Sequence, residues 1–337
     1  MNHLKTSSYD FVLPDNLIAT YPINPPDNAK LLVFDRKTNT ITHTIFKNIA
    51  NFLDNHTLIL NDTKVIKARI FGTKSTGGKI ELLLNKPLPR NQFLVLIRGK
   101  VKVGDLLNFG ILEAKVILVN DDGSRVIEFY IDNKNIDFTQ LIEVLDSIGH
   151  IPLPPYIQRE DEKSDETDYQ TLFAKNDGSV AAPTASLHFT HELLEDLKNK
   201  FGTHFITLHV GSGTFKPVEC EDILNHPMHS EFYEIDEQTQ QIIDSNQKIL
   251  AVGTTVTRTI EYYYKTKQLR GECDLFLNPH NKPQRVDSIL TNFHLPKSTL
   301  IMLVASFVGV EKTLELYNEA IKNNYRFYSY GDAMLIL

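Results

Sequence analysis

The spacing of apolar residues changes partway along the chain, and this change constrains the fold more than any single motif. Between about residue 57 and residue 135 the apolar runs are short and are separated by turn signals such as Gly77-Gly78 and Asp122-Gly123. Short runs of this kind are typical of strands that are joined by tight turns. We therefore expect a β-barrel or a β-sandwich in this part of the chain.

Beyond about residue 150, strand-like runs alternate with segments of helical periodicity. The strand-like runs are "HFITLHV", "KILAVG", "CDLFL" and "RVDSIL". One helical segment, residues 190–201, is expected to begin after Thr190 as its N-cap and to stop at Gly202. Alternation of this kind predicts an α/β layer. Between the two regions, the proline-rich and acid-rich segment 150–168 is expected to be an exposed linker or loop.

Length and composition exclude several classes of protein. At 337 residues the chain is long enough for two domains. The N-terminus lacks the apolar core of a signal peptide, and the longest apolar run, 300–310, is far shorter than the ~20 residues of a membrane span. Cys220 and Cys273 are too few for a disulfide framework, so we interpret them as packing residues. These features predict a cytoplasmic protein without a membrane segment.

Positive charge is concentrated in one region of an acidic chain. The net charge is −7, which on its own argues against a nucleic-acid partner. Between Lys64 and Lys102, however, ten lysines and arginines face a single acid, Glu81. This segment is either a solvated face of strands or a contact surface for a polyanion, and the sequence leaves both interpretations open.

Polar loops follow three of the predicted strands. These loops are "GSGTF" at 211–215, "GTTVTR" at 253–258 and "TNFHLPKST" at 291–299. Ligands of open α/β sheets bind outside the carboxyl ends of the strands, so we expect the three loops to meet at one crevice. The third loop is not a Walker A motif, because Pro296 lacks the N–H that a phosphate cradle requires there. Ser298 or Thr299 is expected to cap the helix that follows.

The residues of these loops and their neighbours allow more than one chemistry. Thr254 or Thr255 is expected to cap a helix whose free N–H groups, with Arg258, would bind a carboxylate. Alternatively, Arg258 pairs with Glu261 on the surface. Glu272 and Asp274 either meet a cation or act in acid–base chemistry, or are simply solvated. A metal site at His226, His229 and Glu231 is a weaker hypothesis, because Pro227 disfavours a helix that would bring the two histidines together. Its alternative is that these are isolated hydrogen-bonding histidines.

Taken together, the motifs resemble one enzyme family over most of the chain. They include "NDTKVIKARIFG", "PLPPYI", "YQTLFA", "AAPTASLHFT", "LHVGSGTF", "MHSEFYE", "AVGTTVTRTIE", "ILTNFHLPKST" and "YRFYSYGDAM", in this order. In this they are similar to the S-adenosylmethionine:tRNA ribosyltransferase-isomerase family of queuosine biosynthesis. The resemblance implies an α/β domain, at 1–56 and 148–337, interrupted by a β-barrel domain at 57–147.

The reaction that the resemblance implies moves the ribosyl group of S-adenosylmethionine onto an aminomethyl-deazaguanine at the wobble position of a tRNA and isomerises it. The product is epoxyqueuosine, and adenine and methionine are released. S-adenosylmethionine is then a consumed co-substrate, and neither a metal nor another cofactor is expected. The tRNA accounts for the cationic segment, and we expect a monomer.

Site residues follow from the same resemblance as hypotheses. His188 and His294 are assigned to proton transfer, and Glu272 or Asp274 to the role of base or sulfonium partner, although packing or hydrogen bonding remains open for each histidine. His209 and Arg258 would orient the donor. Further residues expected to bind substrate are Tyr169, Gly211, Gly213, Thr254, Thr255, Asn292 and Lys297. Those expected to contact tRNA are Lys64, Arg69, Lys79, Arg98, Lys100 and Lys102.

Two other classes of function remain open. The first is a tRNA-binding protein of the same fold with lost or altered donor activity, which two departures from the family's pattern would permit. Ser186 stands where the family usually has glycine, and residues 277–284 replace a usually aromatic turn. The second is a zinc hydrolase that uses the histidine-rich half of the chain.

Overall fold

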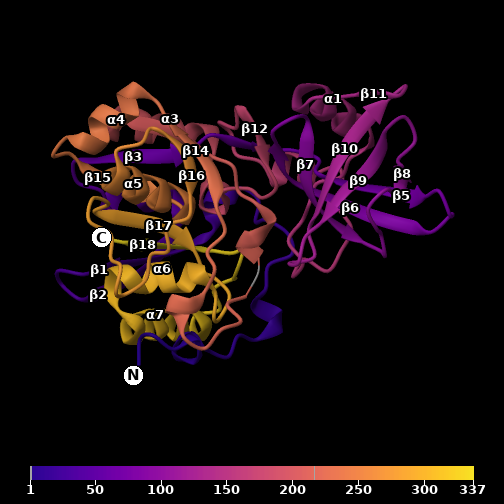
Figure 1. Cartoon of the computed structure of the whole chain (residues 1–337). Helices are drawn as coiled ribbons and strands as arrows, with labels where there is room; N and C mark the ends of the chain where they lie inside the picture. The colour runs from indigo at the N-terminus through magenta and orange to yellow at the C-terminus, as the bar shows by residue number, and fades with distance from the viewer. Residues whose placement is uncertain (1, 216) are drawn as a thin grey trace.

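A computed structural model describes residues 2–215 and 217–337. Figure 1 shows two bodies, a layered α/β domain and a smaller β-barrel at its side. The predicted fold class, an α/β domain interrupted by an inserted barrel, is confirmed, because the strands of the barrel lie between segments of the larger sheet along the chain.

The α/β domain is built on one nine-stranded sheet of order β16-β14-β13-β3-β15-β17-β18-β1-β2. Strands β13, β3, β15 and β17 run parallel to one another, and β1 runs parallel to β18. The strands are β1 (Lys30–Asp35), β2 (Thr40–Ile45), β3 (His56–Asn61), β13 (Thr203–Leu208), β14 (Glu231–Ile235), β15 (Lys248–Val252), β16 (Arg270–Cys273), β17 (Ser288–Asn292) and β18 (Ala333–Ile336).

Strand β3 corrects the expected domain boundary. Residues 57–61 fall inside the barrel domain expected from the sequence, but β3 pairs with β13 and β15 at the centre of the larger sheet. All six of its residues are buried, as in a central strand covered on both faces. A short apolar run predicts a strand equally well in either domain, so the sequence pattern could not separate them. The remaining domain limits stay a prediction.

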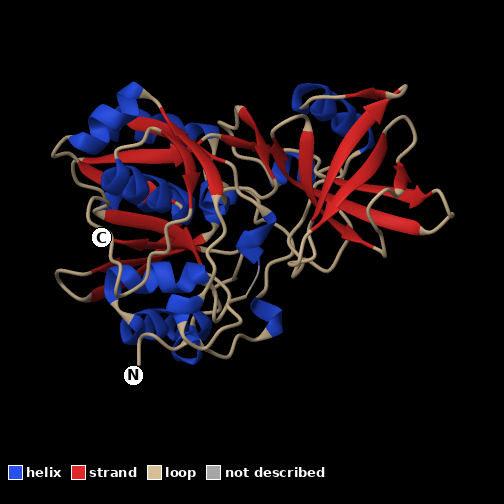
Figure 2. Ribbon diagram, in the orientation of Figure 1, coloured by secondary structure: helices blue, strands red, loops and turns tan. Residues whose placement is uncertain are grey.

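Helices cover both faces of the nine-stranded sheet (Figure 2). One face packs on α3 through Leu193, Leu194 and Leu197. The opposite face packs on α5 over one half of the sheet and on α6 and α7 over the other half. Their bounds are α3 (His191–Phe201), α4 (Glu237–Asp244), α5 (Thr254–Thr266), α6 (Thr299–Val308) and α7 (Val310–Lys322). As predicted, Thr190 caps α3 and Gly202 ends it.

The barrel is a closed sheet of six antiparallel strands, β10-β7-β6-β5-β8-β9, in which β9 pairs back onto β10. A short strand β11 extends β10, and helix α1 packs on the barrel core through Leu141 and Leu145. The bounds are β5 (Arg69–Lys74), β6 (Lys79–Leu88), β7 (Gln92–Arg98), β8 (Leu106–Asn108), β9 (Glu113–Val119), β10 (Arg125–Ile131), β11 (Lys134–Asn135) and α1 (Phe138–Ile148). Closure leaves no open sheet edge among the six strands, and alternate side chains fill the interior.

Two connections join the domains. Strand β4 (Thr63–Val65) pairs with β12 (Asn176–Ser179) in a separate two-stranded sheet. The acid-rich segment contains the short helix α2 (Asp165–Asp168), and here the expectation of an exposed loop is wrong for Asp165. Asp165 is fully buried because Arg159 binds both of its carboxylate oxygens (2.6 and 2.8 Å) and Tyr330 donates to it (2.8 Å).

Within the described residues, no helix is both long and apolar enough to cross a bilayer.

Candidate active site

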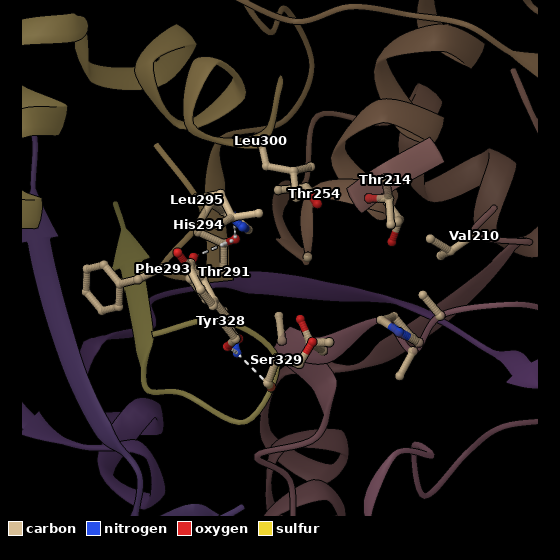
Figure 3. A pocket seen from close by; sticks show the side chains of 18 of the residues that line it. Val210, Thr214, Thr254, Thr291, Phe293, His294, Leu295, Leu300, Tyr328 and Ser329 are labelled. Carbon is tan, nitrogen blue, oxygen red and sulfur yellow. Dashed lines mark hydrogen bonds between the residues drawn. The ribbon is translucent and has the colours of Figure 1, made fainter. Parts of the chain in front are cut away.

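A pocket lies at the carboxyl ends of β15 and β17, and the space within its outline, including the part that is open to solvent, is about 710 Å³. The three polar loops predicted to meet do so here. The first loop contributes Thr214, the second contributes Gly253, Thr254 and Thr255, and the third contributes residues 291–295. Figure 3 shows Val210 and Thr214 on one side of the hollow and His294, Thr291 and Tyr328 on another.

Two helices begin at this pocket. Gly253, rather than Thr254 or Thr255, is the N-cap of α5, so the predicted cap is off by one or two residues. Because glycine has no side chain, no side-chain oxygen accepts from the first turn of α5, and the positive end of the helix dipole faces the pocket unscreened by a cap. Ser298 caps α6 through Oγ, which accepts from the N–H of Ile301 (3.3 Å). Such helix ends favour an anionic ligand group.

His294 contributes a neutral imidazole to the pocket. Its Nε2 lies 2.7 Å from Oγ1 of Thr291, and the same oxygen lies 3.3 Å from the backbone oxygen of Asn292. A neutral imidazole has one N–H and one lone pair, so one ring nitrogen donates and the other accepts. Burial lowers the pKa of His294 to about 3. His294 therefore has the protonation state of a proton acceptor at neutral pH.

Asn292 connects His188 to the C-terminal loop. Its Nδ2 donates to the backbone oxygens of Tyr328 (2.8 Å) and Ser329 (3.1 Å), so its Oδ1 must accept from Nε2 of His188 (3.1 Å). Burial lowers the pKa of His188 to about 4. Asn292 lines the pocket, whereas His188 lies behind it. The prediction that His188 transfers a proton to substrate is not supported by this placement, since Asn292 stands between His188 and the pocket.

Tyrosines form part of the pocket wall. Tyr156 packs against Tyr328 with ring centroids 4.5 Å apart, and its hydroxyl lies 2.6 Å from Oγ of Ser329. Tyr169 is buried, and burial raises the pKa of its hydroxyl. Within the described residues, the Tyr169 hydroxyl has no hydrogen bond of ordinary geometry. Ser329 and the backbone of Ala182 lie close to it and partly oppose the rise in its pKa. Tyrosine faces of this kind attract cations and stack on flat rings.

The "GSG" loop is held from below by a buried ion pair. The N–H of Gly211 donates to Oε1 of Glu231 (2.9 Å), and Oε2 of Glu231 accepts from Nη1 of Arg258 (2.5 Å). Burial alone would raise the pKa of Glu231, but the charge of Arg258 holds it below its ordinary value. Gly213 leaves room for His229, whose Cγ would lie 2.7 Å from a Cβ at that position. The glycines of this loop therefore admit protein groups rather than a ligand.

Arg258 does not line the pocket and its donors are used by protein groups, so this placement does not support its predicted role in orienting the donor. Its Nε and Nη2 donate to the backbone oxygens of Leu275 (3.1 Å) and Cys273 (3.2 Å), and Nη1 is used by Glu231. The alternative pairing with Glu261 is wrong, because the Glu261 carboxylate accepts from three backbone N–H groups at 284–286.

Lys297 likewise faces away from the predicted site. It adopts a positive φ of 57°, and its Nζ pairs with Asp10 (2.7 Å). The surface between Pro296 and the α6 cap therefore belongs to the contact with the N-terminal segment. His209 lies outside the pocket as well, bonded through Nδ1 to Oγ1 of Thr63 (2.8 Å) and stacked on Phe232.

The two carboxylates predicted at and just after β16 are not part of the pocket. Glu272 and Asp274 are exposed near the edge of the sheet, and Glu272 pairs with Lys86 of the barrel (3.0 Å). This placement does not support their assignment as base or sulfonium partner in the pocket. In the described part of the chain, no three His, Cys, Asp or Glu side chains gather as a metal-binding group, and the ring of His226 packs on Phe276.

The predicted tRNA-contacting residues fall into two groups. Lys64 lies on β4, outside the barrel, and pairs with Asp177 (3.0 Å). Arg69 and Arg98 both pair with Glu81, at 2.7 and 3.5 Å. By contrast Lys79, Lys100 and Lys102 are exposed on the barrel and form no ion pair within residues 2–215 and 217–337. A hollow of about 530 Å³ lies beside Lys100 and Lys102.

Several lining residues were missed by the sequence analysis. Tyr156, Thr291, Ser298, Tyr328 and Ser329 line the pocket. The motifs "PLPPYI" and "YRFYSYGDAM" contain three of them, but a motif alone does not show which of its side chains turns inward. No sequence pattern predicted the positive φ of Tyr328 (71°).

A pocket at the carboxyl edge of an α/β sheet, with two helix N-termini and a tyrosine wall, defines a small-molecule-using enzyme that carries an inserted barrel. Comparison with known proteins narrows this class. A family model described as "Queuosine biosynthesis protein" matches residues 6–336. The chain belongs to this family, and it is an enzyme of the transferase and isomerase type.

Relatives match the chain over its whole length. The S-adenosylmethionine:tRNA ribosyltransferase-isomerase of Aliarcobacter butzleri is 66% identical over 339 residues, covering 100% of both chains. The protein of the same name from Nitratiruptor sp. is 62% identical, again over 100% of both. A crystal structure of S-adenosylmethionine tRNA ribosyltransferase from Thermotoga maritima is 35% identical with a TM-score of 0.55, covering 98% of this chain and 100% of that one. The family resemblance stated from the sequence is thus confirmed.

Proposed function

We propose that the chain transfers the ribosyl group of S-adenosylmethionine to the aminomethyl-deazaguanine at the wobble position of a tRNA and isomerises it to epoxyqueuosine. Adenine and methionine leave. The observation that carries this proposal is the single pocket in which two helix N-termini and a tyrosine wall meet a neutral histidine. The names of the full-length relatives support the same reaction.

The donor suits the chemistry of the pocket walls. S-adenosylmethionine carries a carboxylate and a positive sulfonium at opposite ends of a short chain. The uncapped N-terminus of α5 offers the N–H groups of Thr254 and Thr255 to the carboxylate. The faces of Tyr156, Tyr169 and Tyr328 suit the sulfonium and the adenine ring.

His294 is the proposed proton acceptor. Four residues were predicted to be catalytic, and all four lie in the described part of the chain. Of these, His294 lines the pocket, whereas His188, Glu272 and Asp274 do not. The reaction requires removal of a proton beside the sulfonium, and a neutral imidazole has one ring nitrogen with a lone pair for this step. A pKa near 3 makes the free imidazole a weak base. Thr291 holds the ring in place through its contact with Nε2.

The tRNA would contact the barrel through its unpaired lysines. Lys79, Lys100 and Lys102 are exposed, whereas Lys64 and Arg69 are already neutralised by acids. Unpaired cations release counterions from phosphates on binding, so the three lysines should carry the salt dependence of tRNA affinity.

The decisive experiment incubates the purified protein with S-adenosylmethionine and a tRNA that carries the precursor base. Stoichiometric release of adenine and methionine with a matching mass gain of the tRNA would support the proposal. Retained tRNA binding without turnover would favour a binding protein that has lost donor activity. Of the two departures behind that alternative, Ser186 is buried and does not line the pocket, which argues against an effect on donor contacts.

A further inference from the structure

Asn85 on β6 of the barrel contacts the "GSG" loop beside the donor pocket. Strand β6 pairs regularly with β7 up to Leu84, which faces Val95, and resumes with Lys86, which faces Leu94. Asn85 is therefore the extra residue of a β-bulge. Bulges bend a strand and re-aim a side chain out of the regular alternation. Here the re-aimed side chain leaves the barrel and meets the "GSG" loop of the α/β domain.

Oδ1 of Asn85 accepts two hydrogen bonds from Ser212, one from the backbone N–H (3.1 Å) and one from Oγ (3.2 Å). The close approach depends on Gly211, because a Cβ at that position would lie 3.2 Å from the same oxygen. Ser212 is buried, so without Asn85 two of its donors would lack a protein partner.

The loop that Asn85 holds is part of the donor pocket. Val210 and Thr214, on either side of Gly211 and Ser212, both line it. Glu231 fixes the same loop from the α/β side, through Gly211. The loop is therefore set jointly by the two domains. A shift of the barrel against the sheet would therefore move Asn85 relative to the loop, whereas Glu231 belongs to the sheet itself.

We propose that Asn85 is a positioning residue that links the seating of the barrel to donor binding. On the proposed function, on which this inference rests, tRNA docks on the barrel. Docking that seats β6 more firmly then orders Ser212 and tightens the donor pocket, while donor binding strengthens tRNA binding by the same factor. The proposal needs no contact between Asn85 and either substrate.

The test compares wild type, Asn85→Ala and Lys86→Gln. Lys86 is the matched control, because it joins the same two domains through Glu272 (3.0 Å) but does not touch the pocket loop. S-adenosylmethionine affinity is measured by calorimetry with and without tRNA. We expect Asn85→Ala to weaken donor binding about tenfold and to abolish the tightening by tRNA. Lys86→Gln should keep donor affinity and tightening within about twofold of wild type.

A second readout needs neither substrate. Backbone amide exchange in the free protein should accelerate at Ser212 in Asn85→Ala, while Gly211, which bonds to Glu231, keeps its protection. Unchanged exchange at Ser212, or unchanged donor affinity with intact tightening by tRNA, would overturn the role of Asn85. If wild type neither binds nor consumes S-adenosylmethionine, the proposed function fails, and the exchange measurement still decides whether Asn85 orders the loop.

Discussion

Glu231 and Arg258 form a buried ion pair beneath the "GSG" loop, with Oε2 and Nη1 2.5 Å apart and side chains only 2% and 5% exposed. The pair joins strand β14 to helix α5, and its second carboxylate oxygen holds Gly211. Arg258 thus acts on the pocket through Glu231 rather than by contact with a ligand.

Breaking this pair should cost more stability than removing it. Arg258→Met leaves a buried carboxylate without its cation, and we expect the free energy of unfolding to fall by about 3–5 kcal/mol. The double variant Arg258→Met/Glu231→Gln should recover part of that loss, because the unpaired charge is gone. Urea denaturation measures both. Equal losses in the single and double variants would show that the charge of Glu231 is not what Arg258 stabilises.

Stability should decline as the pH falls below 6.5. His188 and His294 have folded pKa values lowered to about 4 and about 3, below the ordinary 6.5. Below pH 6.5 these histidines therefore bind protons in the unfolded chain but not in the folded chain. The stability that they contribute is fully present above pH 6.5 and is lost as the pH falls toward their folded-state pKa values. Each histidine should cost about 1 kcal/mol between pH 6.5 and pH 5.5.

His188→Gln checks this assignment, because glutamine can still donate to Asn292 but does not titrate. Thermal or urea unfolding at several pH values should show a shallower decline in this variant by about 1 kcal/mol over the same window. An identical pH dependence in wild type and variant would mean that His188 is protonated equally in both states.

Substitution of Gly253 should damage the pocket through the backbone. Its φ of 100° is one that side chains rarely adopt, although a Cβ would meet only ordinary contacts at 3.7 and 3.8 Å. Gly253→Ala should therefore lower stability by about 1–3 kcal/mol and displace the first turn of α5. We expect weaker S-adenosylmethionine binding by calorimetry. Gly202→Ala, at the positive-φ end of α3 and outside the pocket, is the control that should lose stability alone.

Charge reversal should separate the free lysines from the paired ones. Lys102→Glu should weaken tRNA binding and lower the slope of log affinity against log salt by about one or more. Lys64→Glu should change that slope less, since Asp177 already neutralises Lys64. Filter binding over a salt series compares the two. Equal slopes for both variants and wild type would show that the barrel lysines do not contact tRNA and are only a solvated surface.

Local signals in the sequence were sufficient for several helix ends of the α/β domain. Thr190 and Gly202 mark the ends of α3, and Ser298 caps α6, because capping depends on the few residues around a helix end. The meeting of three loops at one pocket was predicted from the position of each loop directly after a strand. The domain of β3 was predicted wrongly, because a buried parallel strand and a barrel strand have the same kind of short apolar run.

The contacts that decide the roles of polar residues lie between distant parts of the chain. Arg258 meets Glu231 across 27 residues, and Ser212 meets Asn85 across 127 residues. Lys297 was expected to face substrate, but its partner Asp10 lies on the N-terminal segment. Residue type indicates which groups a side chain is able to bind, whereas only the folded structure shows which of them it does bind.

A crystal structure of the protein with S-adenosylmethionine tests the proposed donor site. We expect the donor carboxylate at the N–H groups of Thr254 and Thr255, the sulfonium against the tyrosine wall, and His294 beside the ribose. Donor bound elsewhere, for example against Glu272 and Asp274 at the edge of the sheet, would contradict this expectation.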